Sequence, residues 1–178
     1  MAGFDWFWKA MGGKQGRNQK RSLAIVDQAA ARVAKLNARS DEDLVARARE
    51  ITASGEVADA AEFLAILSIA ATRTLEMTPF PVQLQAVLRL LEGDVIQMAT
   101  GEGKTLVGAM ANTGFGLMGK RVHSVTVNDY LAARDAEWMG PLVKFFGLTV
   151  AAVTESMTTD ERRKAYKANI VYASVNEI

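Results

Sequence analysis

The chain has 178 residues, of which 49% are hydrophobic, so it can form one α/β domain with a sizeable core and a helical annex. It contains no cysteine, which excludes a disulfide framework, a thiolate metal site and a cysteine nucleophile. A formal net charge of +1 argues against nucleic acid as a partner. The sequence shows no apolar run near the ~20 residues of a membrane span and no secretory signal, so we expect the protein to stay inside the cell.

Residues 1–21 combine aromatic and basic side chains. The aromatic residues are Phe4, Trp6, Phe7 and Trp8, and the basic residues that follow are Lys9, Lys14, Arg17, Lys20 and Arg21. This composition suits the interface of an anionic membrane. A short helix packed on the domain, or a solvated tail, is the alternative. We expect the glycines at 12, 13 and 16 to limit any single helix here.

Residues 22–76 are expected to form the helical annex. Apolar residues at helical spacing predict helices over 21–36 and 59–75. Between them, Ser40 precedes three acidic residues, which is typical of a helix start with a serine cap and acids in the first turn. We expect no catalytic group in this region.

Residues 77–178 are organised around the stretch M-A-T-G-E-G-K-T at 98–105. A buried strand is expected over 94–98 and a helix over 106–118, and a strand, a glycine-rich loop and a helix that opens with Lys-Thr form the layout of a phosphate-binding loop. Gly101 and Gly103 let the backbone curl so that several N–H groups point at one anion. Lys104 supplies a charge for the terminal phosphates, and the Thr105 hydroxyl can hold Mg²⁺.

The loop departs from two known patterns. Met98 stands where G-x-x-x-x-G-K-[ST] requires glycine, and the relaxed form A-x-T-G-x-G-K-T fails because Ala99 directly precedes Thr100. A glycine-rich turn with a surface lysine is the alternative interpretation. The expected flanking strand and helix favour the phosphate loop.

Two prolines upstream of this loop are expected to end the preceding helix, and Pro81 can start the next one. Gln83 would lie in the first turn of that helix. A glutamine amide donates and accepts at once, which matches the edge of an adenine. A surface glutamine that caps the helix is equally compatible with the spacing.

Downstream, strands are expected over 122–127, 148–153 and 170–173, with helices that open at Asn128 and Thr158. Alternating strands and helices predict a parallel sheet flanked by helices, with ligands at the carboxyl ends of the strands. The only histidine, His123, is expected to be structural. The basic run at 162–164 is expected to be a solvated face.

Four stretches resemble the SecA preprotein translocase ATPase family. They are T-G-E-G-K-T-L at 100–106, V-T-V-N-D-Y-L-A-A-R-D-A-E at 125–137, F-P-V-Q-L at 80–84 and S-D-E-D-L at 40–44. The resemblance runs from about Trp8 to the last residue. The stretches W-M-G-P at 138–141 and A-S-V-N-E-I at 173–178 look more like the accessory SecA of actinobacteria.

This resemblance implies a P-loop NTPase fold of the RecA-like or helicase-like kind, with ATP and Mg²⁺ as cofactors. Gln83 would contact the adenine, with Met77 and Phe80 beside it. The phosphates would be held by Gly101, Glu102, Gly103, Lys104 and Thr105, with Lys104 as the catalytic residue and Thr105 at the metal. Residues 128–135 would form the second motor motif, which in the family helps to couple nucleotide state to substrate movement.

The resemblance also implies a motor that couples ATP hydrolysis to protein export from a site in the cytoplasm and on the cytoplasmic face of the membrane. Its partners would be preproteins, a SecY-type channel, anionic phospholipid and, as a homodimer, a second copy. The family's acidic motif would lie beyond Ile178, so we expect an incomplete motor domain that lacks groups needed for turnover. A helicase fragment of related fold is one alternative, against which the charge and Glu102 argue. A short, non-catalytic module that binds nucleotide or lipid is the other.

Overall fold

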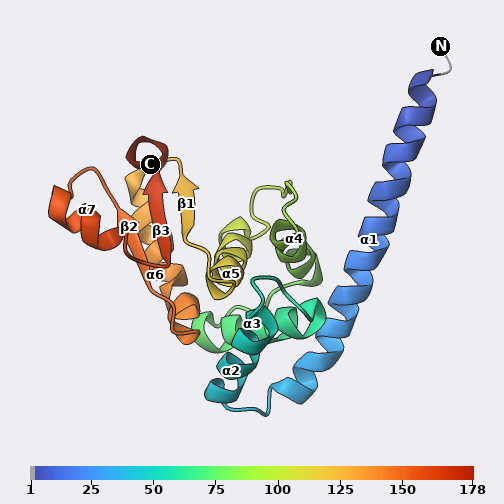
Figure 1. Cartoon of the computed structure of the whole chain (residues 1–178), viewed down its shortest axis with the longest axis horizontal. Coiled ribbons are helices and arrows are strands. Elements are labelled where there is room, and N and C mark those ends of the chain that lie inside the picture. The colour runs from blue at the N-terminus through green and yellow to red at the C-terminus, as the bar shows by residue number, and fades with distance from the viewer. Residues whose placement is uncertain (1–2) are drawn as a thin grey trace.

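The structure, a computed structural model, describes the backbone of residues 3–178 and the side chains of residues 18–178. The helices are α1 (Gly3–Leu36), α2 (Asp41–Thr52), α3 (Ala60–Leu75), α4 (Pro81–Leu91), α5 (Lys104–Leu117), α6 (Asp129–Phe145) and α7 (Thr159–Ala165), and the strands are β1 (Val122–Thr126), β2 (Val150–Val153) and β3 (Ile170–Ser174), before a 3-10 turn, η1 (Val175–Glu177). Helices α1 to α5 lie on one side of the molecule, and the sheet with α6 and α7 lies on the other (Figure 1).

Helix α1 runs unbroken from Gly3 to Leu36, so the expected interruption at its glycines is wrong. A glycine weakens a helix by about 1 kcal/mol relative to alanine but keeps its backbone N–H donor, so the hydrogen-bond ladder can continue through it. The carboxyl half of α1 buries Val26 and Ala29. The aromatic and basic side chains before residue 18 lie outside the described side chains, and their membrane contact stays a prediction.

The annex helices begin where the sequence predicts. The Ser40 side chain accepts the Asp43 N–H at 3.1 Å at the start of α2, and Asp59 accepts the Glu62 N–H at 3.0 Å at the start of α3. Arg47 of α2 then donates to both carboxylate oxygens of Glu62, at 3.0 and 2.8 Å. These hydrogen bonds lower the pKa of Glu62 and fix α2 against α3.

One apolar core joins the annex to the helices beside the phosphate loop. Its centre is α3, where Phe63, Leu64, Ile66 and Leu67 are fully buried, and Met110 of α5 belongs to the same cluster. Burial of apolar surface on this scale is the main stabilising contribution to the fold. Domain boundaries after residues 21 and 76 stay a prediction.

The sheet is parallel with the order β1-β3-β2, and Val122 and Val150 both pair with Ile170. All five residues of β3 are buried, as expected for a central strand covered on both faces. Helix α6 packs on one face of the sheet through Ala132 and Ala136. The other face is covered by the last residue of α7, Ala165, and by Tyr166 and Ala168 just after it. The predicted α/β fold with a parallel sheet is therefore confirmed.

The strand expected over 94–98 is wrong, because this segment is irregular and lies outside the sheet. Ile96 and Met98 pack against the core, while Val95 is 98% exposed. Alternating burial of this kind needs only an extended chain, whereas a strand also needs a neighbour with which to exchange backbone hydrogen bonds. Instead, the Asp94 N–H donates to the Arg89 carbonyl at 3.0 Å, and the Asp94 carboxylate pairs with the Arg89 side chain.

Arg162 corrects the expectation of a wholly solvated basic run on α7. Its guanidinium donates to the carbonyls of Met157 at 3.1 Å and Glu155 at 3.0 Å, and it also pairs with Glu177. Arg162 therefore holds the β2–α7 loop against η1. His123 packs edge-on against Tyr166, with 5.7 Å between the ring centroids, which gives the histidine a packing role.

Candidate functional site

The loop before α5 leaves its helix N-terminus open. Gly101 and Gly103 adopt φ angles of +87° and +78°, a region that favours glycine. Gly103 is the N-cap of α5, and no side chain caps this helix, whereas Ser40, Asp59, Asn128 and Thr158 cap α2, α3, α6 and α7. The first-turn N–H groups of α5 are thus available to an anion, at the positive end of the helix dipole.

Gln83 connects α4 to this loop. Its Oε1 accepts the Phe80 N–H at 2.9 Å, and its Nε2 donates to the Glu102 carbonyl at 2.8 Å. Gln83 is only 7% exposed, and a Cβ at position 103 would collide with its amide nitrogen. Glycine is therefore favoured at 103 by its φ angle, and it also leaves room for the Gln83 amide.

Lys104 folds back over the loop that it follows. Its Nζ donates to the Ala99 carbonyl at 2.8 Å and to the Met98 carbonyl at 3.2 Å. The side chain is exposed to solvent, so it can exchange these carbonyls for a ligand without crossing a packed layer. The ammonium group is thus placed at the mouth of the loop.

Glu102 binds the loop's own backbone. Its Oε2 accepts the Ala99 N–H at 2.6 Å, while its N–H donates to the Ala99 carbonyl at 3.3 Å. The Ala99 N–H, a donor that could also bind a phosphate oxygen, is therefore already hydrogen-bonded to the Glu102 carboxylate. Reasoning from the sequence missed this contact, although a glutamate three residues after the donor is the spacing of a capping box.

The side chains of Met77, Phe80 and Thr105 form none of these hydrogen bonds. The Phe80 side chain is 68% exposed, and Met77 lines a pocket of about 290 Å³ with Trp138 and Met139 of α6. Thr105 is partly buried in the first turn of α5. Over residues 18–178, no group of three or more metal-ligating side chains gathers in one place. The contacts thus unite Gln83, Glu102, Gly103 and Lys104.

The predicted second motor motif lies where the three strands end. Asn128 caps α6 by accepting the Leu131 N–H at 2.9 Å. The next residue, Asp129, accepts the Glu155 N–H after β2 at 2.5 Å and the Ser174 hydroxyl at the end of β3 at 2.7 Å. The first of these bonds and then the second lower the pKa of Asp129. One carboxylate therefore ties together the carboxyl ends of β1, β2 and β3.

We expect these hydrogen bonds of Asp129 to make the free energy of unfolding depend on pH. Because the pKa of Asp129 is lower in the folded state than the unfolded value of about 3.9, its contribution is complete above that pH and is lost as pH falls below it. Asp129→Asn should therefore unfold more easily at pH 7 but lose less stability than wild type between about pH 4 and pH 3. Urea midpoints at these pH values measure the effect, with exposed Asp27→Asn as control. Parallel losses in wild type and Asp129→Asn would contradict it.

Comparison with known proteins agrees with these motifs. Residues 7–178 match the family described as the SecA DEAD-like domain. The chain belongs to this SecA family. It is 69% identical over 178 residues to protein translocase subunit SecA 2 of Corynebacterium efficiens, and these residues cover all of the chain and 23% of that relative.

Other SecA relatives show the same partial coverage. Protein translocase subunit SecA 2 of Corynebacterium diphtheriae is 65% identical over 178 residues, which cover the whole chain and 23% of the relative. The SecA 2 of Mycolicibacterium smegmatis is 53% identical over 175 residues, 97% of the chain and 22% of the relative. The resemblance to accessory SecA is thus confirmed, and the match favours SecA over a helicase of related fold. The chain spans about a quarter of the length of these relatives.

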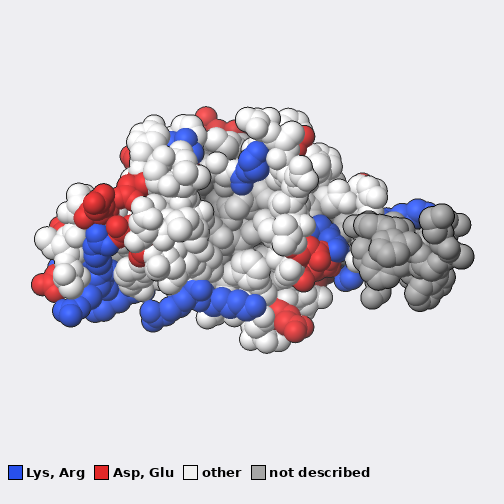
Figure 2. Space-filling view, turned by 90° about the horizontal axis from the view of Figure 1, so that it is seen from above, with Lys and Arg blue, Asp and Glu red and all other residues white. Residues whose placement is uncertain are grey.

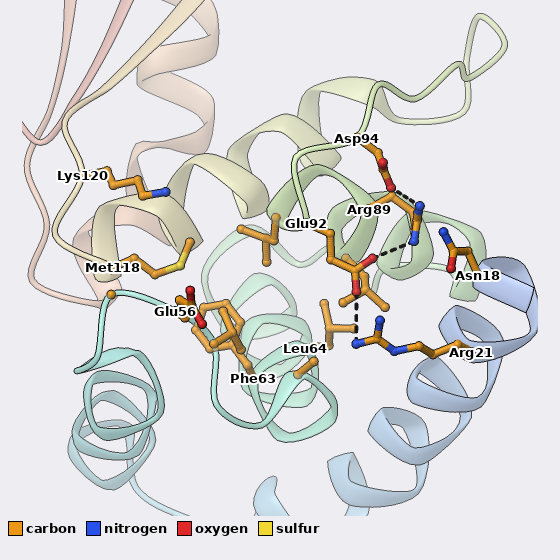
Figure 3. Close-up of a pocket in the computed structure, with 15 residues that line it drawn as sticks. Asn18, Arg21, Glu56, Phe63, Leu64, Arg89, Glu92, Asp94, Met118 and Lys120 are labelled. Atoms are coloured by element: carbon orange, nitrogen blue, oxygen red, sulfur yellow. Dashed lines mark hydrogen bonds and ion pairs between the residues drawn. The ribbon is translucent and has the colours of Figure 1, made fainter. Parts of the chain in front are cut away.

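A second cavity of the SecA-like chain lies between α1, α3 and α4 and has a volume of about 590 Å³. In Figure 3, Arg89 pairs with both Glu92 and Asp94, and Arg21 reaches Glu92 at 3.6 Å. These charges neutralise one another and connect α1 to α4. The face shown in Figure 2 likewise carries acidic and basic side chains close together. Because the charged side chains of this cavity already pair with one another, whereas the N-terminus of α5 is uncapped, we place the candidate site at the phosphate loop.

Proposed function

We propose that the chain is the ATP-binding portion of a SecA-type motor that couples ATP hydrolysis to protein export across the cytoplasmic membrane. The observation that carries this proposal is the uncapped N-terminus of α5, which follows Gly101 and Gly103 and lies beside Lys104, in a chain of the SecA family. Such a terminus offers backbone donors and a positive dipole to phosphate.

In this proposal, Lys104 moves from the Ala99 and Met98 carbonyls to the terminal phosphates of ATP, and the N–H groups of residues 101–105 surround them. The Thr105 hydroxyl would hold Mg²⁺, which when bound supplies charge that neutralises the phosphates. Lys104 would act as the catalytic residue by its charge at the terminal phosphate.

Gln83 would contact the adenine from the first turn of α4, with Met77 and Phe80 beside it. Each of its polar atoms already makes one hydrogen bond. An amide nitrogen carries a second hydrogen and an amide oxygen a second lone pair, so Gln83 can bind the base while it keeps the loop in place. The exposed ring of Phe80 can then cover the base from the side.

The partners that we propose are preproteins, a SecY-type channel and a second copy of the motor, with anionic phospholipid at residues 1–21. The protein would reside in the cytoplasm and peripherally on the cytoplasmic face of the membrane. The described helices include none that is long and apolar enough to cross a membrane.

Binding to anionic vesicles tests the lipid contact. We expect this binding to weaken as the salt concentration rises, because salt screens the attraction between basic side chains and anionic lipid. Equal binding to neutral vesicles would contradict it.

Titration of the chain with a fluorescent ATP analogue and Mg²⁺ tests the proposed function. We expect saturable binding that unlabelled ATP reverses and that single-stranded RNA leaves unchanged. Displacement by RNA would favour a helicase, and absence of binding would overturn the proposed nucleotide site.

Replacing Gln83 by leucine in the same titration should reduce the preference for ATP over GTP.

A further inference from the structure

We propose that Glu102 is an internal competitor of phosphate, which closes the loop in the nucleotide-free protein and must swing away before nucleotide binds. This inference rests on the proposed nucleotide site. Glu102 thereby sets the affinity and the association rate of that site, in addition to any contact that it makes with the bound ligand.

The closing contact is a charge-assisted hydrogen bond. Glu102 Oε2 lies 2.6 Å from the Ala99 nitrogen, and a carboxylate forms shorter and stronger hydrogen bonds with a backbone N–H than a neutral acceptor does. The Glu102 N–H returns to the Ala99 carbonyl at 3.3 Å, so residues 99–102 form a turn closed on both sides. The side chain remains exposed, and packing therefore does not prevent it from leaving.

Lys104 strengthens the same closure from the opposite side. Its Nζ donates to the Ala99 carbonyl at 2.8 Å, so residue 99 is bound at its N–H by a carboxylate and at its carbonyl by an ammonium group. The two charged side chains thus hold one residue of the loop. Gln83 restrains the Glu102 backbone through a bond of 2.8 Å but leaves the carboxylate free to rotate.

Opening therefore precedes the productive contact of Lys104 with phosphate. When only a fraction of molecules is open, the apparent dissociation constant equals the intrinsic constant divided by that fraction. A ligand with several charged oxygens can replace both the carboxylate at Ala99 and the carbonyls at Lys104. Loss of the Glu102 contact should raise the open fraction and so tighten nucleotide binding by about three- to tenfold.

Two substitutions separate closure from simple repulsion between Glu102 and phosphate. Glu102→Asp keeps the charge but shortens the side chain by one methylene, which should lengthen and weaken the hydrogen bond to the Ala99 nitrogen. Glu102→Gln removes the charge but keeps an oxygen that can accept the N–H. The control is Glu42→Gln, which removes the same charge from the exposed first turn of α2.

The dissociation constant and association rate of a fluorescent ATP analogue with Mg²⁺ distinguish closure of the loop from repulsion between Glu102 and phosphate. We expect Glu102→Asp to bind about three- to tenfold more tightly through faster association, and Glu42→Gln to match wild type. If Glu102→Asp matches wild type while Glu102→Gln binds more tightly, repulsion explains the effect and the proposal fails. Weaker binding by both variants would make Glu102 a ligand contact and also overturn it. If wild type and Lys104→Ala both fail to bind, the nucleotide site itself is refuted.

Discussion

Replacing Lys104 by alanine is expected to weaken nucleotide binding by about tenfold to a hundredfold. A hydrogen bond from an ammonium group to a phosphate contributes about 1.5–3 kcal/mol, which corresponds to that range in affinity. In the free protein, Lys104 binds two carbonyls of its own loop, and the loss of those bonds in the variant offsets part of the effect. Titration with a fluorescent nucleotide measures the change.

Lys144→Ala is the matched control, because Lys144 lies exposed in the last turn of α6. It removes the same charge without touching the phosphate loop and should bind nucleotide as wild type does. The melting temperature should be unchanged in both variants, since neither lysine is buried. Equal affinity of Lys104→Ala and wild type would remove this loop from the nucleotide site.

Replacing Phe63 by alanine is expected to lower the free energy of unfolding by about 3–5 kcal/mol, the usual cost of emptying a buried aromatic site. The Phe63 ring is 0% exposed in the first turn of α3, near Gly114 of α5 and Leu91 of α4. Since small proteins are stable by about 5–15 kcal/mol, such a loss is a large share of the total. Urea unfolding followed by circular dichroism measures it.

Phe80 provides the control for Phe63, because it is the same residue type and 68% exposed. Phe80→Ala should change the free energy of unfolding by less than about 0.5 kcal/mol. The same variant should weaken binding of the adenine nucleotide if the ring flanks the base. Comparable destabilisation by the two substitutions would show that the core is not centred on α3.

Elements specified by a few neighbouring residues could be predicted from the sequence. The starts of α2, α6 and α7 follow from Ser40, Asn128 and Thr158, because a side chain that caps a helix acts on a donor only three residues away. The strands that pair in the sheet were also predicted, since β3 is a short apolar run between polar segments. The irregular path of residues 94–98 was not, because pairing depends on distant parts of the chain.

The site shows the same division between local and distant information. The glycines and Lys104 of the loop are recognised from their spacing, and the structure places them at the N-terminus of α5. The bond from Gln83 to the Glu102 carbonyl links residues 19 positions apart, and that from Ser174 to Asp129 spans 45. No spacing rule within one helix or turn predicts such contacts, which depend on how α4 and the sheet pack.

The order of the strands also determines when the sheet can form during synthesis. Strands β1 and β2 leave the ribosome first, yet each hydrogen-bonds only to β3, whose residues are the last of the three to be made. The helices of the annex, by contrast, lie earlier in the chain and can assemble while the chain is still growing. Until residue 174 has emerged, β1 and β2 therefore lack the strand to which they hydrogen-bond, and their unpaired backbone groups can pair with neighbouring nascent chains.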